Sequence, residues 1–103
     1  MSEREGPGPE PGLNTRVKRL AGIAWRIVDE EAVLVNVKQD EVIHLDPVGS
    51  FIWSKMDGQA PMQEIADAVV EEFEVDLETA LEDALVFARR LLEQGAAEVV
   101  ELE

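Results

Sequence analysis

The sequence contains no cysteine and only one histidine, His44. Without cysteine the chain has no disulfide framework, no thiol nucleophile and no cysteine-ligated metal, and it suits a reducing compartment. A single histidine does not complete a typical zinc site. Ser50 and Ser54 have no evident base partner for a hydrolytic triad, and no glycine-rich phosphate loop is present. We therefore expect a binding protein rather than an enzyme, with no metal and no cofactor.

Basic residues are also scarce. Nine Lys and Arg stand against 23 Asp and Glu, which gives a net charge of −14. This balance argues against nucleic-acid binding, because phosphates attract Lys and Arg. No apolar run is long enough to span a bilayer, and the N-terminal MSEREGPGPEPG is unlike a signal peptide. We expect a cytoplasmic protein without a membrane partner. The acidic surplus indicates either solvated helix faces or an acidic surface for a basic partner.

The length of 103 residues predicts one small domain. Residues 1–22 are predicted to be a disordered or flexible tail, because GPGPEPG favours neither a helix nor a strand ladder. The domain is expected over residues 23–103. Its first half contains three strand candidates, at residues 24–28, 33–37 and 41–45. The short polar turns between them predict antiparallel hairpins and therefore a meander.

Three helices are predicted after the strands. Asp46 and Pro47 are typical of a helix start, and Gly58 of its end. The second helix runs from about Pro61 to Phe73, and the third follows the capping residue Asp76 and ends at Gly95. Residues 98–102 either add a short strand or fray. The predicted fold is α+β: a winged helix-turn-helix-like domain with a three-stranded antiparallel meander followed by three helices.

The third strand, EVIHL, is predicted to be an open edge of the sheet. Edge strands expose unpaired main-chain groups and are usually protected by lysine, proline or a bulge, but this strand has neither lysine nor proline. If the third helix packs beside it, the two form a groove suited to an extended peptide that adds as a strand. The alternatives are that the C-terminal tail or a second copy of the domain covers the edge.

An ordered set of residues resembles a known family over about residues 24–97. The features are Leu45-Asp46, Gly49, Ile52-Trp53 and Asp57-Gly58, followed by Ile65-Ala66, Phe73, Asp83, Phe87, Leu91 and Gly95. This order resembles PqqD and its relatives, the recognition elements for ribosomally made, post-translationally modified peptides. Two segments depart from the family pattern: Lys38-Gln39-Asp40 replaces a turn with glycine, and Ala96-Ala97 replaces an apolar pair. A relative that serves lasso or radical-modified peptides is therefore at least as plausible as PqqD itself.

The resemblance implies a non-catalytic peptide chaperone. Such proteins bind the leader segment of a precursor peptide along the third strand and present it to a modifying enzyme, such as a radical S-adenosylmethionine enzyme, or to a leader peptidase. Carried over by position, the peptide-binding residues are Glu41, Val42, Ile43, His44, Leu45, Asp83, Phe87, Arg90 and Leu91. Alternation lets only half of the strand side chains face the peptide. Phe87 lies off the main apolar stripe of its helix, so it is the leading pocket candidate, with core packing as the alternative.

A second hypothesis remains open at this point. An acidic winged-helix regulatory protein that acts through protein–protein contacts would have the same composition and the same predicted elements. The oligomeric state is also open, because a small domain with a free edge forms either a monomer or a strand-exchanged dimer.

Overall fold

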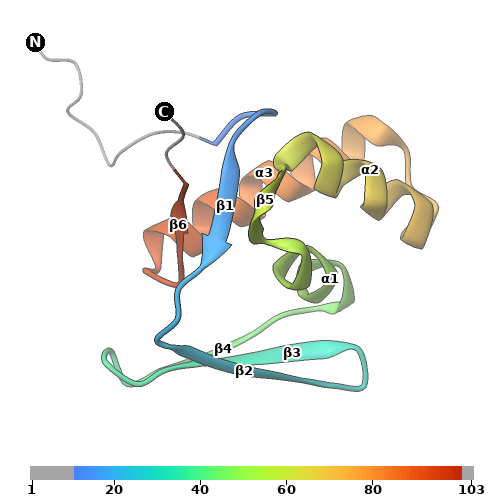
Figure 1. Ribbon diagram of the computed structural model, residues 1–103. Helices are drawn as coiled ribbons and strands as arrows, with labels where there is room; N and C mark the ends of the chain where they lie inside the picture. Colours follow the sequence, from blue (N-terminus) through green and yellow to red (C-terminus); the bar gives the residue numbers. More distant parts are fainter. Residues whose placement is uncertain (1–10, 101–103) are drawn as a thin grey trace, which may run out of the picture.

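The computed structural model describes residues 11–100, which form two small antiparallel sheets and three helices (Figure 1). In chain order the elements are β1 (Arg16–Arg19), β2 (Ile23–Val28), β3 (Glu31–Asn36), β4 (Glu41–His44), α1 (Pro47–Lys55), β5 (Asp57–Pro61), α2 (Met62–Phe73), α3 (Leu77–Glu93) and β6 (Ala97–Val99). The predicted α+β class is confirmed, including the meander and the three helices. The sequence did not predict the second sheet, whose strand order is β5-β1-β6.

The meander has the strand order β2-β3-β4. Leu34 of β3 lies opposite Ile43 of β4, and both side chains are buried in the core. Among the residues that the structure describes, β4 pairs with β3 alone. β4 is therefore an edge strand, as the predicted strand order required.

Helix α1 begins where the sequence predicted. The side chain of Asp46 accepts a hydrogen bond from the Gly49 N–H at 2.8 Å, and Pro47 occupies the first turn. The helix ends at Lys55, before the predicted end at Gly58. Gly58 instead belongs to β5 with φ +85°, and a β-carbon there would stand 3.2 Å from Cβ of Lys18. Glycine is thus required at this position by the close approach of β1.

Ser50 joins α1 to the meander. Its buried hydroxyl accepts a hydrogen bond from the Ala32 N–H at 2.6 Å and donates one to the Leu45 carbonyl at 3.3 Å. The hydroxyl therefore lies between β3 and the segment that follows β4. This bridge fixes the end of β4 against the first turns of α1.

The flexible tail predicted for residues 1–22 is wrong for β1. This strand is the central strand of the second sheet, and Val17 within it is fully buried. RVKR is short and basic, so it carries little strand signal of its own, and it is held by β5 on one side and β6 on the other. The part of the predicted tail in residues 1–10 lies outside the described residues.

The C-terminal segment forms β6 over Ala97–Val99 and pairs with β1. Residues 101 and 102 of the predicted tail strand lie outside the described residues. Lys18 and Glu98 form an ion pair across the β1–β6 ladder at 3.2 Å. Because β6 belongs to the second sheet, it does not cover the open side of β4.

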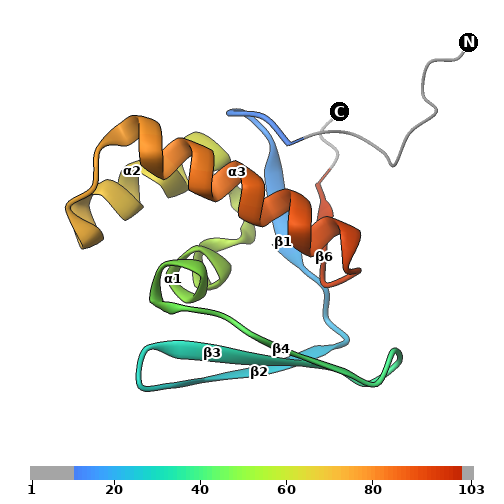
Figure 2. The same ribbon diagram turned by 180° about the vertical axis from the view of Figure 1, so that it is seen from behind.

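The helices lie against both sheets. In Figures 1 and 2, α1 lies between the meander and the α2–α3 pair. The buried side chains of α3 are three small ones, one leucine and one phenylalanine, namely Ala80, Ala84, Ala88, Leu91 and Phe87. Small side chains permit close approach of α2. Within residues 11–100, no helix has both the length and the hydropathy that crossing a bilayer demands.

Arg19 links three elements at the junction of the two sheets. Its guanidinium donates to the carbonyls of Trp53 at 2.9 Å and Ser54 at 3.1 Å, in the last turn of α1. The same group lies 5.2 Å from the ring centre of Trp25, and the two indoles meet edge to face at 5.9 Å. A cation is favourable both at a helix C-terminus and over an aromatic ring, so this cluster stabilises the junction.

Candidate peptide-binding cleft

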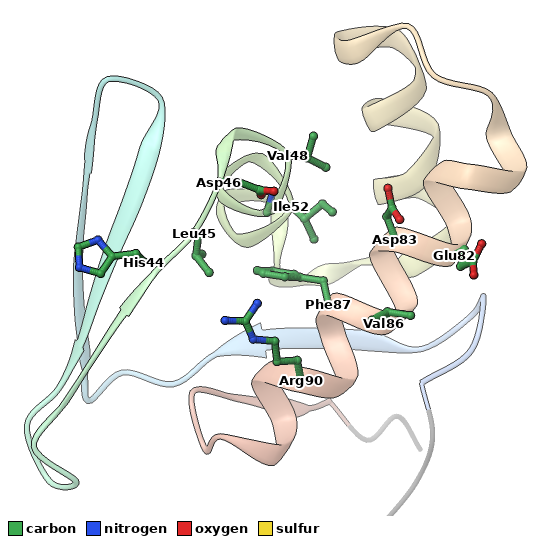
Figure 3. A pocket seen from close by; sticks show the side chains of 11 residues that line it. His44, Leu45, Asp46, Val48, Ile52, Glu82, Asp83, Val86, Phe87 and Arg90 are labelled. Carbon is green, nitrogen blue, oxygen red and sulfur yellow. The ribbon is translucent and has the colours of Figure 1, made fainter.

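A cleft of about 530 Å³ lies between the end of β4, the first turns of α1 and the middle of α3 (Figure 3). Two segments that are far apart in the chain, residues 44–52 and 82–90, thus contribute to one site. The residues that line it are His44, Leu45, Asp46, Val48, Gly49, Ile52, Glu82, Asp83, Val86, Phe87 and Arg90.

On the β4 side of the cleft, main-chain N–H and C=O groups of the strand are exposed along its open edge. The Leu45 N–H donates to the Ala32 carbonyl at 2.9 Å, so the main-chain groups of Leu45 point toward β3. Hydrogen-bonded and non-hydrogen-bonded pairs alternate along an antiparallel ladder. The N–H and C=O groups of Val42 and His44 therefore point away from β3, toward the open side. These four groups are available for another strand.

The side chains of β4 alternate as expected. Ile43 and Leu45 are buried in the core, whereas Val42 is 56% exposed and His44 is exposed. In Figure 3 the imidazole of His44 points away from Phe87 and α3. The side-chain contribution of the strand to the cleft therefore comes mainly from Leu45.

The floor of the cleft is apolar. The Phe87 ring is 9% exposed and lies over the first turn of α1, where a β-carbon on Gly49 would stand 3.0 Å from its Cε1 atom. Ile52 is buried beneath, and Val48 and Val86 form apolar sides. Glycine at position 49 thus makes room for the ring.

The rim of the cleft is charged with both signs. Glu82 and Asp83 lie toward the α1 end of α3, and Arg90 lies two turns further along the helix (Figure 3). All three residues are exposed. Within residues 11–100, no ion pair or hydrogen bond engages their side chains. These charges are therefore available to a ligand.

The carboxyl groups with a lowered pKa lie elsewhere among the described residues. Hydrogen bonds from Gln59 and Ala60 lower the pKa of Asp57, and hydrogen bonds from the Thr79 side chain and N–H lower that of Asp76. Both aspartates are exposed and stabilise a turn or a helix start, away from the cleft lining. In the described part of the chain, no group of three or more His, Cys, Asp or Glu side chains forms a metal site. The cleft as built can bind an extended chain.

The structure brings together five of the nine residues predicted for peptide binding: His44, Leu45, Asp83, Phe87 and Arg90. Glu41, Val42 and Ile43 belong to β4 but do not line the cleft. Leu91 is fully buried in the core. Phe87 satisfies both alternatives stated for it, because it packs in the core and also lines the cleft.

The α1 wall was missed by sequence reasoning. Val48, Gly49 and Ile52 line the cleft because the first turns of α1 face α3. The available signal was the apolar spacing directly after the Asp46-Pro47 helix start, but this spacing indicates only a buried helix face. Glu82 and Val86 were missed although they lie on the same side of α3 as Asp83, Phe87 and Arg90, at spacings of four residues up to Arg90.

A second hollow of about 260 Å³ lies between the β2–β3 hairpin, α1 and α2. Ile27, Phe51 and Phe73 contribute apolar surface to it, and the rings of Phe51 and Phe73 meet edge to face at 5.5 Å. This hollow shares no lining residue with the cleft.

Comparison with known proteins gives two solved structures of similar fold. The first is TbiB1 in complex with the TbiA(beta) leader peptide, with 32% identity and a TM-score of 0.72 over 79% of this chain and 94% of that one. The second is a lasso peptide synthetase B1 complexed with the leader peptide, with 21% identity and a TM-score of 0.71 over 80% of this chain and 96% of that one. Comparison with curated proteins gives no match.

The family comparison covers the meander from β3 onward, all three helices and the start of β6. The model of the family described as coenzyme PQQ synthesis protein D (PqqD) matches residues 31–97. None of these findings supports the alternative of an acidic regulatory protein. The matched segment contains all three parts of the chain that form the cleft, namely the end of β4, the first turns of α1 and the middle of α3. On this evidence the chain belongs to the PqqD family.

Proposed function

We propose that this domain is a non-catalytic chaperone that binds the leader segment of a ribosomal precursor peptide by strand addition to β4. It presents the bound precursor to a maturation enzyme, such as a radical S-adenosylmethionine enzyme or a leader peptidase. The reaction takes place on that enzyme, and this chain contributes recognition alone. Because precursor peptides are made on ribosomes, the proposed place of action is the cytoplasm.

One observation carries the proposal: an open strand edge stands directly beside an apolar cleft. The main-chain groups of Val42 and His44 point to the open side, and Phe87 lies at the floor of the neighbouring cleft. In strand addition, main-chain hydrogen bonds supply affinity and pockets for alternate side chains supply selection. Here β4 offers the main-chain hydrogen-bonding groups, and the cleft offers the pocket for side chains.

The comparisons support the choice of a leader peptide as the occupant. The matched structure of TbiB1 contains that protein in complex with a leader peptide, and the match covers 94% of the TbiB1 chain. Most folded proteins protect their strand edges against pairing, whereas a leader segment in extended form has main-chain groups that are free to pair. The proposed contact residues are those of β4, the following Leu45, and Asp83, Phe87 and Arg90 on α3.

The sharpest test removes one N–H from the open side of β4. In Val42→Pro the lost N–H points away from β3, so the β3–β4 ladder is retained and the protein stays folded. The matched control, Val42→Ala, shortens the same side chain but keeps the N–H. The probes are the synthetic leader of the precursor encoded beside this chain and the TbiA(beta) leader, titrated into 15N-labelled full-length protein.

We expect amide shifts in β4 and in the middle of α3 for the parent and for Val42→Ala. Val42→Pro should weaken binding by up to roughly tenfold, since one main-chain hydrogen bond with a net contribution of about 0.5–1.5 kcal/mol is lost. Equal binding by Val42→Pro and Val42→Ala would contradict strand addition to β4. The absence of any response to both leaders would contradict leader recognition.

A further inference from the structure

The cleft is lined by charges in a fixed order along α3. Asp83, Phe87 and Arg90 follow at spacings of four and three residues, so they share one face of the helix. Glu82 adds a second carboxylate beside Asp83. A negative end, an apolar middle and a positive end therefore follow one another along the cleft (Figure 3).

The helix spacing matches the repeat of an extended peptide. Four helical residues, from Asp83 to Phe87, rise about 6 Å, and three, from Phe87 to Arg90, rise about 4.5 Å, whereas two strand residues advance about 6.8 Å. The long side chain of Arg90 makes up the remaining difference of about 3 Å over the two steps. A strand lying beside β4 directs every second side chain into the cleft. Its inward positions i, i+2 and i+4 therefore meet Asp83, Phe87 and Arg90 in turn.

The direction of the added strand follows from the sheet. All strand pairs of the described residues are antiparallel, and continuing that pattern places the peptide antiparallel to β4. β4 runs toward α1, whereas α3 runs from the α1 end of the cleft toward Arg90 (Figures 2 and 3). An antiparallel peptide thus enters with its N-terminal part at Glu82 and Asp83 and leaves with its C-terminal part at Arg90.

Resting on the proposed leader-binding function, we infer that the cleft selects leaders by charge order. The preferred segment has a basic residue at i, a large apolar residue at i+2 and an acidic residue at i+4, read from N to C. The basic residue meets the carboxylates of Glu82 and Asp83, which have no ion pair within residues 11–100. The acidic residue meets the Arg90 guanidinium. The net charge of −14 additionally favours approach of the basic end.

The reversed order is disfavoured by the same geometry. A peptide with an acidic residue first places a carboxylate against Glu82 and Asp83, and its basic residue against Arg90. Like charges in contact select against wrong partners even where matched pairs add little affinity. Charge order is therefore a specificity device, and the apolar residue over Phe87 is the main source of affinity at the centre.

The test is selection of a displayed library of random twelve-residue peptides against the full-length protein. The first variant is the double reversal Glu82→Lys with Asp83→Lys. The matched control is Asp67→Lys with Glu71→Lys, which makes the same change of charge at exposed positions of α2 outside the cleft. An enriched peptide and its isomer with the two charges exchanged are then compared by fluorescence anisotropy.

We expect the parent and the control to enrich the order basic, apolar, acidic at alternate positions. The cleft reversal should enrich acidic residues at the first of these positions. The charge-exchanged isomer should bind the parent roughly tenfold more weakly, because two exposed ion pairs become like-charge contacts. This difference should shrink at about 1 M salt, where screening acts over about 3 Å.

Different results would contradict the proposal of charge-order selection and the proposal of strand addition to β4. Enriched peptides without a charge order, or with an order that Glu82→Lys with Asp83→Lys leaves unchanged, would overturn the charge inference while leaving peptide capture intact. Binding of an enriched peptide by Val42→Pro as tight as by Val42→Ala, or no enrichment by the parent, would overturn strand addition itself and the charge inference with it.

Discussion

Gly49 lies so close to Phe87 that a β-carbon on the glycine would stand 3.0 Å from the ring Cε1 atom. In a helix, Gly→Ala ordinarily stabilises by about 0.5–1 kcal/mol. Here the added methyl group meets the ring and the Asp46 side chain, also at 3.0 Å. We expect Gly49→Ala to destabilise by about 1–3 kcal/mol, measured by urea unfolding, because the core is overpacked.

The control for this prediction is a smaller residue at position 87. In a Phe87→Leu background, Gly49→Ala should cost clearly less, with a coupling of at least about 0.5 kcal/mol in the double-mutant cycle. Additive effects of the two substitutions would show that the Gly49–Phe87 contact does not limit the packing.

Phe87→Ala should weaken leader binding more than Phe51→Ala does. Phe87 lines the cleft, whereas Phe51 lines the second hollow against Phe73. Removal of a buried Phe side chain costs about 3–5 kcal/mol, so the binding titrations are made at a temperature at which both variants remain folded by circular dichroism. A Phe87→Ala protein that binds leader as tightly as the parent would remove this residue from the site.

Glu30→Gly should stabilise the domain. Asp29 and Glu30 form the two-residue turn between β2 and β3, and their φ angles are +54° and +69°. Such a turn favours Asp-Gly, because glycine adopts positive φ without steric cost. The expected gain is about 0.5–1 kcal/mol in the free energy of unfolding, after the entropy cost of glycine is subtracted. Glu31→Gly removes the same charge from a strand residue and should destabilise instead.

The cap of α3 makes stability depend on pH in the acid range. Hydrogen bonds from the Thr79 side chain and N–H hold the pKa of Asp76 below 3.8. A carboxyl group with a lowered folded pKa stabilises fully above its unfolded pKa, and this stability is lost as the pH falls through the folded pKa. We therefore expect the parent to exceed Asp76→Asn in stability at pH 7, and the difference to shrink when the pH is lowered toward about 2, through the lowered folded pKa of Asp76. An unchanged difference in urea unfolding at both pH values would contradict this role of the charge.

The predictable part of the fold is the part with local signals. β3 is rich in β-branched residues, and Asp46-Pro47 marks the start of α1, so both were placed from the sequence. β1 and β5 were missed because RVKR and DGQAP have no strand periodicity, and they become strands by pairing with each other and, for β1, also with β6. That pairing joins segments about forty residues apart, which no local pattern reports.

The same distinction applies to the cleft. The open edge of β4 followed from the hairpin order, and Phe87 from its place beside the apolar stripe of α3. Gly49 and Ile52 join the site only because α1 turns its first turn toward α3, which is a tertiary fact. Leu91 was placed in the site by resemblance, but small alanines on the same face draw α3 close enough to bury it.

The Arg19 cluster determines what intrinsic fluorescence reports. Trp25 and Trp53 are the two tryptophans of the chain, and neither belongs to the lining of the cleft. Both indoles sense the guanidinium at the junction of the sheets. Their fluorescence emission consequently reports the packing of β1 against α1. A ligand that binds without changing this packing leaves the emission unchanged. Any emission change on addition of ligand would thus reveal motion transmitted across the domain.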